Sequence, residues 1–421
     1  MTSTPPAAPA QTAGSLWRHG GFLKLWSGET LSQFGAQLSH LALPVLAVTI
    51  LQATEWEVGM LNAVGTAAFL LIGLPAGAWI DRMLKRRVMI AADIVRAVAL
   101  AVLPLTWYFG EIEIWHLYAV GAVLGVATVF FDVAYQSYVP ILVKPTQISD
   151  ANGKLESTAQ IARIGGPAVG GVLLAVVAPP VVLIATSVTY VASFLFLSRI
   201  RDEEVRADPK ERMPLHREIA EGVAFVWQHP LLRRITAATA ASNLFGVIAM
   251  TMVPLLILRE LALSPAVMGL IFSVGAAGGL LGAVATPRIA ARVGEGTIIP
   301  VALALGGAFT LLMPLAAAVP VLAVPMLIVA EFGFSFSVLV YNISQVSFRQ
   351  RVCPARLLGR MNASIRCVVW GVMPIGALVA GGLGTVIGVV PTMWIGAVGS
   401  ILATGFVAFS PLAGMRRLPE N

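Results

Sequence analysis

The stretch EVGMLNAVGTAAFLLIGLPAGAWIDRMLKRR (57–87) decides the fold class of this chain. Its first part, residues 57–80, is almost wholly apolar, and a helix needs about 20 such residues to cross a lipid bilayer. Its last part, DRMLKRR (81–87), is strongly basic, as cytoplasmic loops of membrane proteins are. The stretch therefore predicts a membrane-spanning helix followed by a cytoplasmic loop.

The composition of the whole chain agrees with this prediction. Of its 421 residues, 57% are hydrophobic and 12% charged, and the mean hydropathy is +0.85. An ordinary soluble domain is about a quarter charged, so a soluble globule, a disordered chain and a nucleic-acid-binding module are excluded. The two cysteines, Cys353 and Cys367, are too few for a disulfide framework and fit no metal motif, so we expect no metal and no cofactor.

Twelve apolar stretches predict an all-α membrane protein with twelve transmembrane helices. They lie at 24–51, 57–80, 88–109, 115–139, 155–178, 180–199, 234–258, 265–287, 296–318, 321–346, 362–386 and 389–410. Basic residues gather in the loops after even-numbered stretches, whereas the loops on the other side contain Arg259 alone. The positive-inside rule then places both termini in the cytoplasm, and we expect a multi-pass protein of a bacterial inner membrane.

One long polar segment, 200–233, divides the stretches into two sets of six. The expected parts are a disordered tail at 1–15, a six-helix bundle at 16–199, a second bundle at 234–410 and a tail at 411–421. Within the linker, HREIAEGVAFVWQH (216–229) has the spacing of an amphipathic helix on the cytoplasmic surface. The halves echo each other at an offset of about 210 residues, a repeat typical of transporters that hold substrate near the midplane.

The loop GAWIDRMLKRR (77–87) resembles the signature Gly-x-x-x-Asp-Arg-x-Gly-Arg-Arg of the major facilitator superfamily. The matching residues are Gly77, Asp81, Arg82, Lys85 and Arg86, and Leu84 replaces the second glycine. Gly77 permits close helix packing, and Asp81 can sit at a helix N-terminus of the other half, where the helix dipole favours an anion. We expect a conformational latch here; the alternative is a basic loop that only sets orientation.

The fifth apolar stretch contains GGPAVGG (165–171), which resembles the antiporter signature of drug exporters. The residues that carry the resemblance are Gly153, Gly166, Pro167, Gly170 and Gly171, while Ala162 stands where glycine is usual. Small residues let helices approach closely, and a proline bends a span. Generic packing of membrane helices is the alternative explanation.

Longer segments carry a resemblance to one branch of the superfamily. FFDVAYQSYVP (130–140), YNISQVSFRQRVCP (341–354) and LLGRMNASIRCVVWGVMPIGALVAGG (357–382) are similar to the enterobactin-exporter and macrolide-efflux-like group. The resemblance covers nearly the whole chain. It implies the major facilitator fold, with two pseudo-symmetric six-helix bundles, and proton-driven efflux of a medium-sized organic molecule.

Seven charged residues fall inside the predicted spans, where each costs roughly 2.5–3.5 kcal/mol at a helix centre. They are Glu29, Asp93, Arg96, Asp132, Arg163, Glu331 and Arg366. Asp93 and Arg96 share a helix face. Asp132 and Arg163 lie at similar depth on consecutive spans. We expect these four residues to form a network near the cytoplasmic side, joined to the latch; it can be static, or it can break and reform during transport.

Glu331 lies near the middle of the bilayer with no basic residue at its depth, so we expect it to take up a proton. Two polar stripes follow helical spacing: Glu331, Ser335, Asn342 and Gln345 on one span, and Glu29, Gln33, Gln37 and His40 on the first. The family resemblance implies that both stripes face the central cavity. Glu331 and Glu29 are the leading candidates for proton or cation coupling, with Asp132 third; helix packing is the alternative.

Aromatic and amide side chains on the central spans can wall a broad apolar pocket, because such groups bind ligands by shape. The cavity candidates are Gln33, Gln37, His40, Phe131, Tyr135, Asn243, Phe245, Tyr341 and Asn342. Ordinary packing inside the protein is the alternative for the aromatic members.

The sequence therefore predicts a secondary active transporter, expected as a monomer, that exports an amphiphilic drug, siderophore or secondary metabolite in exchange for protons. Uptake of a nutrient, or movement of a lipid across the membrane, would use the same fold and stays open. A membrane enzyme would need a metal motif such as HExxH or a phosphate-binding loop, and the sequence contains neither.

Overall fold

The computed structural model describes residues 16–80, 82–201, 204, 215–354 and 357–415. The predicted tail at 1–15, Asp81 and the last residues, 416–421, lie outside the described part. Within that part the chain is helical throughout, with short connections and no strand. Twelve helical segments are long and apolar enough to cross a membrane, which confirms the predicted all-α membrane fold.

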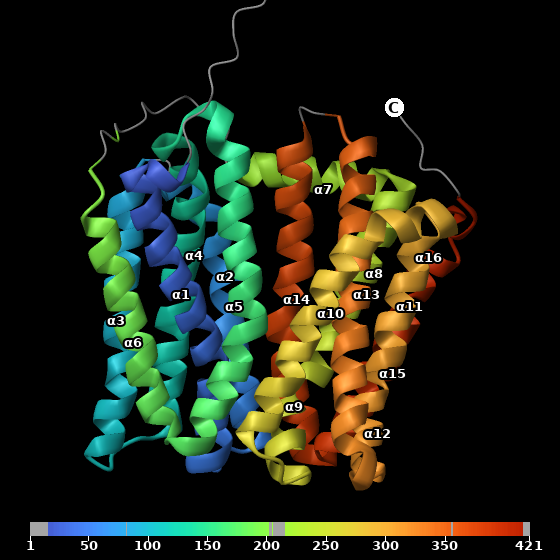
Figure 1. Ribbon diagram of the computed structural model, residues 1–421. Helices are drawn as coiled ribbons and strands as arrows, with labels where there is room; N and C mark the ends of the chain where they lie inside the picture. The colour runs from blue at the N-terminus through green and yellow to red at the C-terminus, as the bar shows by residue number, and fades with distance from the viewer. Residues whose placement is uncertain (1–15, 81, 202–203, 205–214, 355–356, 416–421) are drawn as a thin grey trace, which may run out of the picture.

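The first half of the chain forms six spans (Figure 1). They are α1 (Gly20–Val45), α2 (Glu55–Ile80), α3 (Lys85–Tyr108), α4 (Ile114–Leu142), α5 (Ile148–Val176) and α6 (Pro179–Ser198). Three short turns begin or extend them, namely η1 (Leu16–Arg18), η2 (Leu46–Ile50) and η3 (Pro145–Gln147). Short connections between long helices leave consecutive spans antiparallel.

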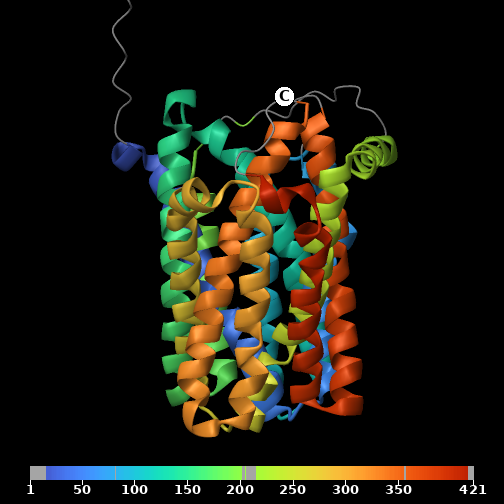
Figure 2. The same ribbon diagram turned by 90° about the vertical axis from the view of Figure 1, so that its right-hand side faces the viewer.

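The second half forms six further spans beside the first (Figures 1 and 2). They are α8 (Pro230–Thr251), α10 (Pro265–Val293), α11 (Ile298–Thr310), α13 (Ala323–Val352), α14 (Leu358–Ile387) and α15 (Val389–Ala403). Shorter helices extend these spans: α9 (Val253–Leu255), η4 (Leu256–Glu260), α12 (Leu312–Ala318), η5 (Pro320–Leu322), α16 (Gly405–Ala408) and η7 (Pro411–Gly414). Between the halves, α7 (Leu215–Gln228) runs crosswise to the spans at one end of the molecule.

The two halves repeat each other in backbone detail. The first span of each half ends in a π-helical turn, η2 in one and η4 in the other. Two residues beyond each turn lie Gln52, with a φ of 51°, and Ala262, with a φ of 50°; no other non-glycine residue of the described part has a positive φ. Such a backbone is unfavourable for a residue with a Cβ atom, so its recurrence 210 residues later is evidence for the predicted internal repeat.

The two ends of the bundle differ in charge. Loops that follow even-numbered spans lie at the upper end in Figure 1, together with α7. This end carries Arg82, Arg87, Arg199, Arg233 and Arg351, and we call it the basic end. The other end is called the opposite end.

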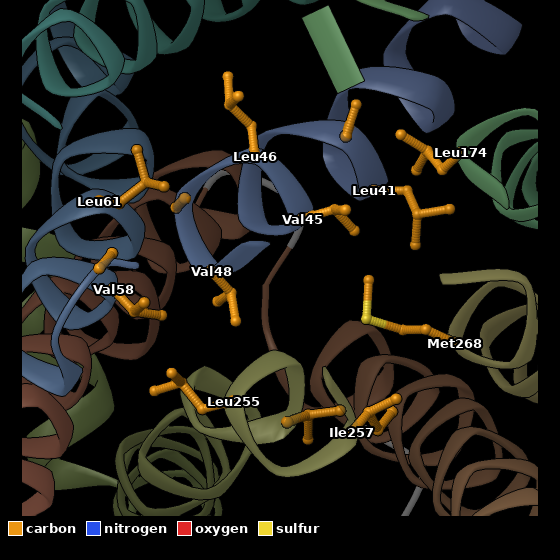
Figure 3. Packing of buried hydrophobic residues seen from close by; sticks show 14 of the residues in the cluster. Leu41, Val45, Leu46, Val48, Val58, Leu61, Leu174, Leu255, Ile257 and Met268 are labelled. Atoms are coloured by element: carbon orange, nitrogen blue, oxygen red, sulfur yellow. The ribbon is translucent and has the colours of Figure 1, made fainter. Parts of the chain in front are cut away.

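Three clusters of buried apolar side chains show where the halves meet. The largest lies at the opposite end and joins the two halves, since it contains Leu41 and Val45 from the first and Ile257 and Met268 from the second (Figure 3). Each of the other two clusters, at the basic end, takes its members from one half only. The halves are therefore packed together at the opposite end and have separate cores at the basic end.

Candidate transport site

Glycines let the backbones of the two halves touch at the opposite end. Where α5 crosses α10, a side-chain carbon on Gly171 would lie 2.9 Å from the Pro265 carbonyl oxygen and 3.0 Å from the Gly269 Cα. Where α2 crosses α14, a side-chain carbon on Gly59 would lie 2.7 Å from the Gly381 Cα. Side-chain carbons do not fit at such distances from backbone, so a larger residue at either crossing would force the halves apart.

The antiporter-like residues of α5 lie in these packing contacts. Gly166 faces the Gln37 side chain of α1, and Gly170 faces Leu38 of the same helix. The Pro167 carbonyl oxygen approaches Gly269 of α10. The motif thus packs α5 against one helix of its own half and one of the other half.

Polar side chains join the halves at the same end. Arg259 of η4 donates to Glu55 Oε1 at 3.2 Å and to the Ala53 carbonyl oxygen at 2.5 Å. Asn62 Nδ2 of α2 donates to Thr251 Oγ1 of α8 at 2.7 Å. The sequence pointed to neither contact, because each joins residues about 200 positions apart.

Replacing Arg259 with Gln is expected to loosen the opposite end. The ion pair with Glu55 is partly exposed, so its loss should cost about 1 kcal/mol and shift the balance between conformations roughly fivefold. Electron–electron resonance between spin labels at Thr49 and Glu260, in a chain with both cysteines replaced, would measure the separation of the halves. Arg292→Gln, at the basic end, is the matched control. Equal distance distributions for Arg259→Gln and its parent would contradict a role of Arg259 in holding the halves together at the opposite end.

One buried guanidinium, that of Arg96, contacts a carboxylate and two aromatic rings within the first half. Arg96 Nη2 of α3 lies 2.5 Å from Asp93 Oδ1, as the spacing of the two residues predicts. The guanidinium carbon is 4.1 Å from the centre of the Phe131 ring and 4.5 Å from that of the Tyr190 ring. Arg96 is 3% and Asp93 0% exposed, so two aromatic faces and one carboxylate hold a cation that water does not reach. The sequence did not point to Tyr190.

Two further carboxyl groups, Glu29 of α1 and Asp132 of α4, lie within electrostatic range of Arg96. We call these two residues, with Asp93 and Arg96, the Arg96 cluster. Glu29 is 5% exposed and accepts a hydrogen bond from Gln33 Nε2 at 2.7 Å. Within the described residues, Glu29 Oε2, Asp93 Oδ2 and Arg96 Nε have no hydrogen-bond partner. Glu29 and Asp93 are buried and Asp132 is half-buried, so the two buried carboxyl groups alone outnumber the one guanidinium, and buried charges must be compensated.

Arg163 lies apart from the Arg96 cluster, contrary to the sequence-based expectation. Its side chain is exposed, and it makes no ion pair with any residue that the structure describes. The basic neighbour of Asp132 is Arg96 instead. Equal depth on consecutive spans places two residues at one level, but it leaves the rotation of each helix about its axis undetermined.

Glu331 is a carboxyl group of the second half that forms no ion pair with the described residues. It is half-buried on α13, and its side chain packs into the space where Gly275 of α10 has no side chain. Its Oε2 is buried without a hydrogen-bond partner among the described residues, and none of their basic side chains pairs with it. Such a carboxyl group is costly when ionised unless a proton or another cation meets it.

The residues of the polar stripe on α13 differ in their exposure. Ser335, one turn beyond Glu331, is half-buried, and Asn342 is exposed. Gln345 is 4% exposed, and its Oε1 has no partner in the described part of the chain. Gln345 is therefore inside the second half rather than on the accessible stripe that we expected.

The polar stripe of α1 joins the Arg96 cluster to α5. Glu29 is bonded to Gln33, and Gln37 packs against Gly166. Gln33 and Gln37 are half-buried, and His40 is exposed. The stripe thus contributes accessible amide groups next to a buried carboxyl group.

Three of the expected pocket aromatics fill space inside their own half. Phe131, beneath Arg96, is 2% exposed. Tyr341 is 4% exposed, and its hydroxyl oxygen lies 2.6 Å from Thr239 Oγ1. The Phe245 ring occupies the place where Gly399 of α15 has no side chain. In this conformation these rings pack helices together; Phe131 and Tyr341 are buried, and Phe245 is half-buried.

Other cavity candidates keep accessible surface. Tyr135 is half-buried, with its ring stacked 6.2 Å from that of Phe131. Asn243 is half-buried as well, and its Nδ2 donates to the Val369 carbonyl oxygen at 3.1 Å. Together with Asn342, which is exposed, they present amide and phenol groups that are not fully buried.

The structure describes part of the predicted latch. Among the described residues, a side-chain carbon on Gly77 would have no neighbour within 4 Å, so the close packing expected there is not seen with them. The separate cores of the halves at the basic end explain this difference. Asp81 lies outside the described residues, and Arg82 is exposed.

Neighbouring latch residues bind helix ends. Arg86 donates to the carbonyl oxygens of Leu197 and Ser198 at 3.1 and 3.0 Å, at the C-terminal end of α6. The Lys85 amide donates to Glu204 Oε1 at 2.7 Å, so this linker residue caps α3. The sequence did not point to Glu204.

The chain has twelve spans in two repeated halves, which are joined at one end and have separate apolar cores at the other. This arrangement is a secondary-transporter fold, and each half contains candidate coupling carboxyl groups. Comparison with known proteins assigns the family. The chain belongs to the Major Facilitator Superfamily, whose sequence model matches residues 25–377.

Known relatives at low identity include efflux proteins. The chain is 24% identical to macrolide efflux protein A of Streptococcus pyogenes over 213 residues, which cover 49% of this chain and 51% of that protein, about half its length. It is 25% identical to the multidrug efflux pump Tap of Mycolicibacterium fortuitum over 331 residues, 76% of this chain and 78% of the pump. The chain is therefore a multi-pass transporter with macrolide and multidrug efflux pumps among its relatives.

Solved structures support the same fold. A bacterial homologue of the iron transporter ferroportin in its inward-facing state matches with a TM-score of 0.70 and 17% identity, covering 93% of this chain and 98% of the other. The outward-facing state of such a homologue matches with a TM-score of 0.56 and 15% identity, covering 92% and 98%.

Proposed function

We propose that this transporter exports an amphiphilic small molecule, such as a drug, siderophore or secondary metabolite, in exchange for protons. The observation that carries the proposal is the surplus of buried and half-buried carboxyl groups: three share one guanidinium in the Arg96 cluster, and Glu331 has no cation partner among the described residues. Efflux relatives support the direction of transport. Accessible amide and phenol groups beside apolar walls suit an amphiphilic substrate.

In this proposal the basic end faces the cytoplasm, following the positive-inside rule. An inward-facing state fits this proposal, because the apolar cluster shared by the halves lies at the opposite end, whereas no described apolar cluster joins them at the basic end. Substrate enters between the halves from the cytoplasm. Rocking of one half against the other closes the basic end and opens the opposite end, with Gly77, Asp81, Arg82 and Arg86 acting as the latch.

In this scheme, the transport site holds either protons or substrate, but not both at once. Glu331, Glu29 and, third, Asp132 hold protons when the site is empty of substrate, since a neutral carboxyl group is cheaper to bury than a charged one. Substrate binding displaces a proton to the cytoplasm, and protons from outside displace the substrate after the halves have rocked. Asp93 and Arg96 hold the first-half site in place.

Transport direction is the first property to test. Cells with and without the protein would be compared in a growth-inhibition panel of macrolides, dyes and siderophores. An exporter should raise the inhibitory concentration of at least one compound several-fold and lower its accumulation in cells. Higher accumulation in cells that contain the protein would instead favour the alternative, an uptake transporter or lipid translocator.

A further inference from the structure

An apolar groove runs down the outside of the first half, between α3 and α4. Its volume is about 470 Å³, within the range of sites that bind small ligands. The residues that line it are Met83, Val88, Ala91, Ala92 and Val95 on one side and Ala122, Val123, Val126, Ala127 and Phe130 on the other. Val95 and Val123 are 44% and 39% exposed, as apolar side chains that face lipid are.

The length and depth of the groove match one leaflet of a bilayer. From Val88 to Val95 it follows α3 for seven residues, or about 10 Å, starting one turn below the basic end of that helix. Half of a hydrocarbon core is about 15 Å thick. The groove is therefore long enough for about two thirds of an acyl chain of one leaflet, on the side of the basic end.

Two arginine side chains without an ion-pair partner in the described part of the chain lie at the mouth of the groove. The side chains of Arg82 and Arg87 are exposed and make no hydrogen bond or ion pair within the described part of the chain. Arg87 is one helical turn before Ala91, so both share the face of α3 that lines the groove. This sets them apart from Lys85, which pairs with Glu204 at 3.7 Å.

A pair of aromatic side chains also lies at the groove, near the basic end. Trp79, at the end of α2, is 47% exposed, and its ring stacks on that of Phe130 with the centroids 6.1 Å apart. Exposed tryptophans are typical of the headgroup region of a membrane. The arginines, the tryptophan and the groove thus follow one another in the order headgroup, interface and hydrocarbon.

We infer that the groove between α3 and α4 binds one anionic phospholipid of the leaflet at the basic end. One acyl chain lies along Val88–Val95, and the phosphate lies between Arg82 and Arg87. An anionic headgroup is favoured over a zwitterionic one, because the ammonium group of the latter would lie beside two arginines. The inference does not depend on what the transporter carries or in which direction.

The test uses the full-length protein and phosphatidylglycerol with a photo-activatable group in one acyl chain. Cross-links are expected in peptides that contain residues 88–95 and 122–130. Native mass spectrometry should show that Arg82→Gln with Arg87→Gln lowers phosphatidylglycerol affinity roughly tenfold or more, given about 1 kcal/mol for each basic residue near a lipid surface. Arg288→Gln with Arg292→Gln, also exposed at the basic end, is the matched control and should leave affinity unchanged.

A second variant distinguishes the contribution of the groove to lipid affinity from that of the arginine charges. Ala91→Phe fills the groove, leaves both arginines in place and changes an exposed residue, so it should fold normally and still lower the affinity. Three results would each overturn the inference: equal affinity of the arginine variant and its parent, no effect of Ala91→Phe, or phosphatidylcholine bound as tightly as phosphatidylglycerol.

Discussion

Replacing Glu331 with Gln should abolish accumulation driven by a proton gradient. The amide keeps the size of the side chain in its space beside Gly275 but cannot exchange a proton. If one proton is exchanged per substrate, a gradient of one pH unit supports about tenfold accumulation, since one unit corresponds to about 1.4 kcal/mol. In inverted vesicles with an acidic lumen, the wild-type protein should approach that ratio for a radiolabelled macrolide, and Glu331→Gln should stay near onefold.

Two matched variants separate coupling from folding. Glu331→Asp keeps a carboxyl group and should retain part of the gradient dependence. Ser335→Ala, one turn away on the same stripe, should retain most of it. If Glu331→Gln accumulates the macrolide with the same dependence on the gradient as the wild type, Glu331 is not the coupling residue, and the Arg96 cluster becomes the remaining candidate.

Replacing Arg96 with Ala should destabilise the first half strongly. It removes the one guanidinium among three carboxyl groups and empties the space between the Phe131 and Tyr190 rings. Removal of one partner from a buried ion pair typically costs about 3–5 kcal/mol. The apparent Tm in detergent, followed by loss of the monodisperse peak in size-exclusion chromatography, should fall by roughly 5 °C or more.

Arg163→Ala is the matched control for Arg96→Ala. Arg163 is an arginine inside the predicted spans too, but it is exposed and forms no ion pair with the described residues, so its loss should change stability by no more than about 0.5 kcal/mol. The double variant Asp93→Asn with Arg96→Met removes both charges and should recover much of the loss. Similar melting of Arg96→Ala and Arg163→Ala would contradict a structural role for the Arg96 cluster.

The spans could be predicted from the sequence because crossing a membrane is a local property of length and hydropathy. Boundaries were less predictable where polar residues continue a helix beyond the hydrocarbon. The fifth span was expected to begin at 155, yet α5 begins at Ile148, since a helix can extend into water without apolar residues. The repeat offset of 210 was also predictable, and the matching backbone at Gln52 and Ala262 supports it.

The site was predictable only in part, because helical spacing fixes neighbours on one helix but not the rotation of that helix in the bundle. The Asp93–Arg96 pair followed from spacing on α3. The outward position of Arg163 and the inward position of Phe245 depend on how α5 and α8 pack. The contact of Arg259 with Glu55 could not be predicted, because it joins residues of the two halves that are 204 positions apart in the sequence.

Proton release on substrate binding tests the exchange mechanism most directly. The purified protein would be placed in weakly buffered detergent solution, and a macrolide selected by the growth panel would be added while the pH is recorded. Exclusive binding at the buried carboxyl groups predicts release of about one proton per chain at saturation, with clearly less from Glu331→Gln. Saturable macrolide binding by the wild-type protein without any proton release would contradict the proposed exchange.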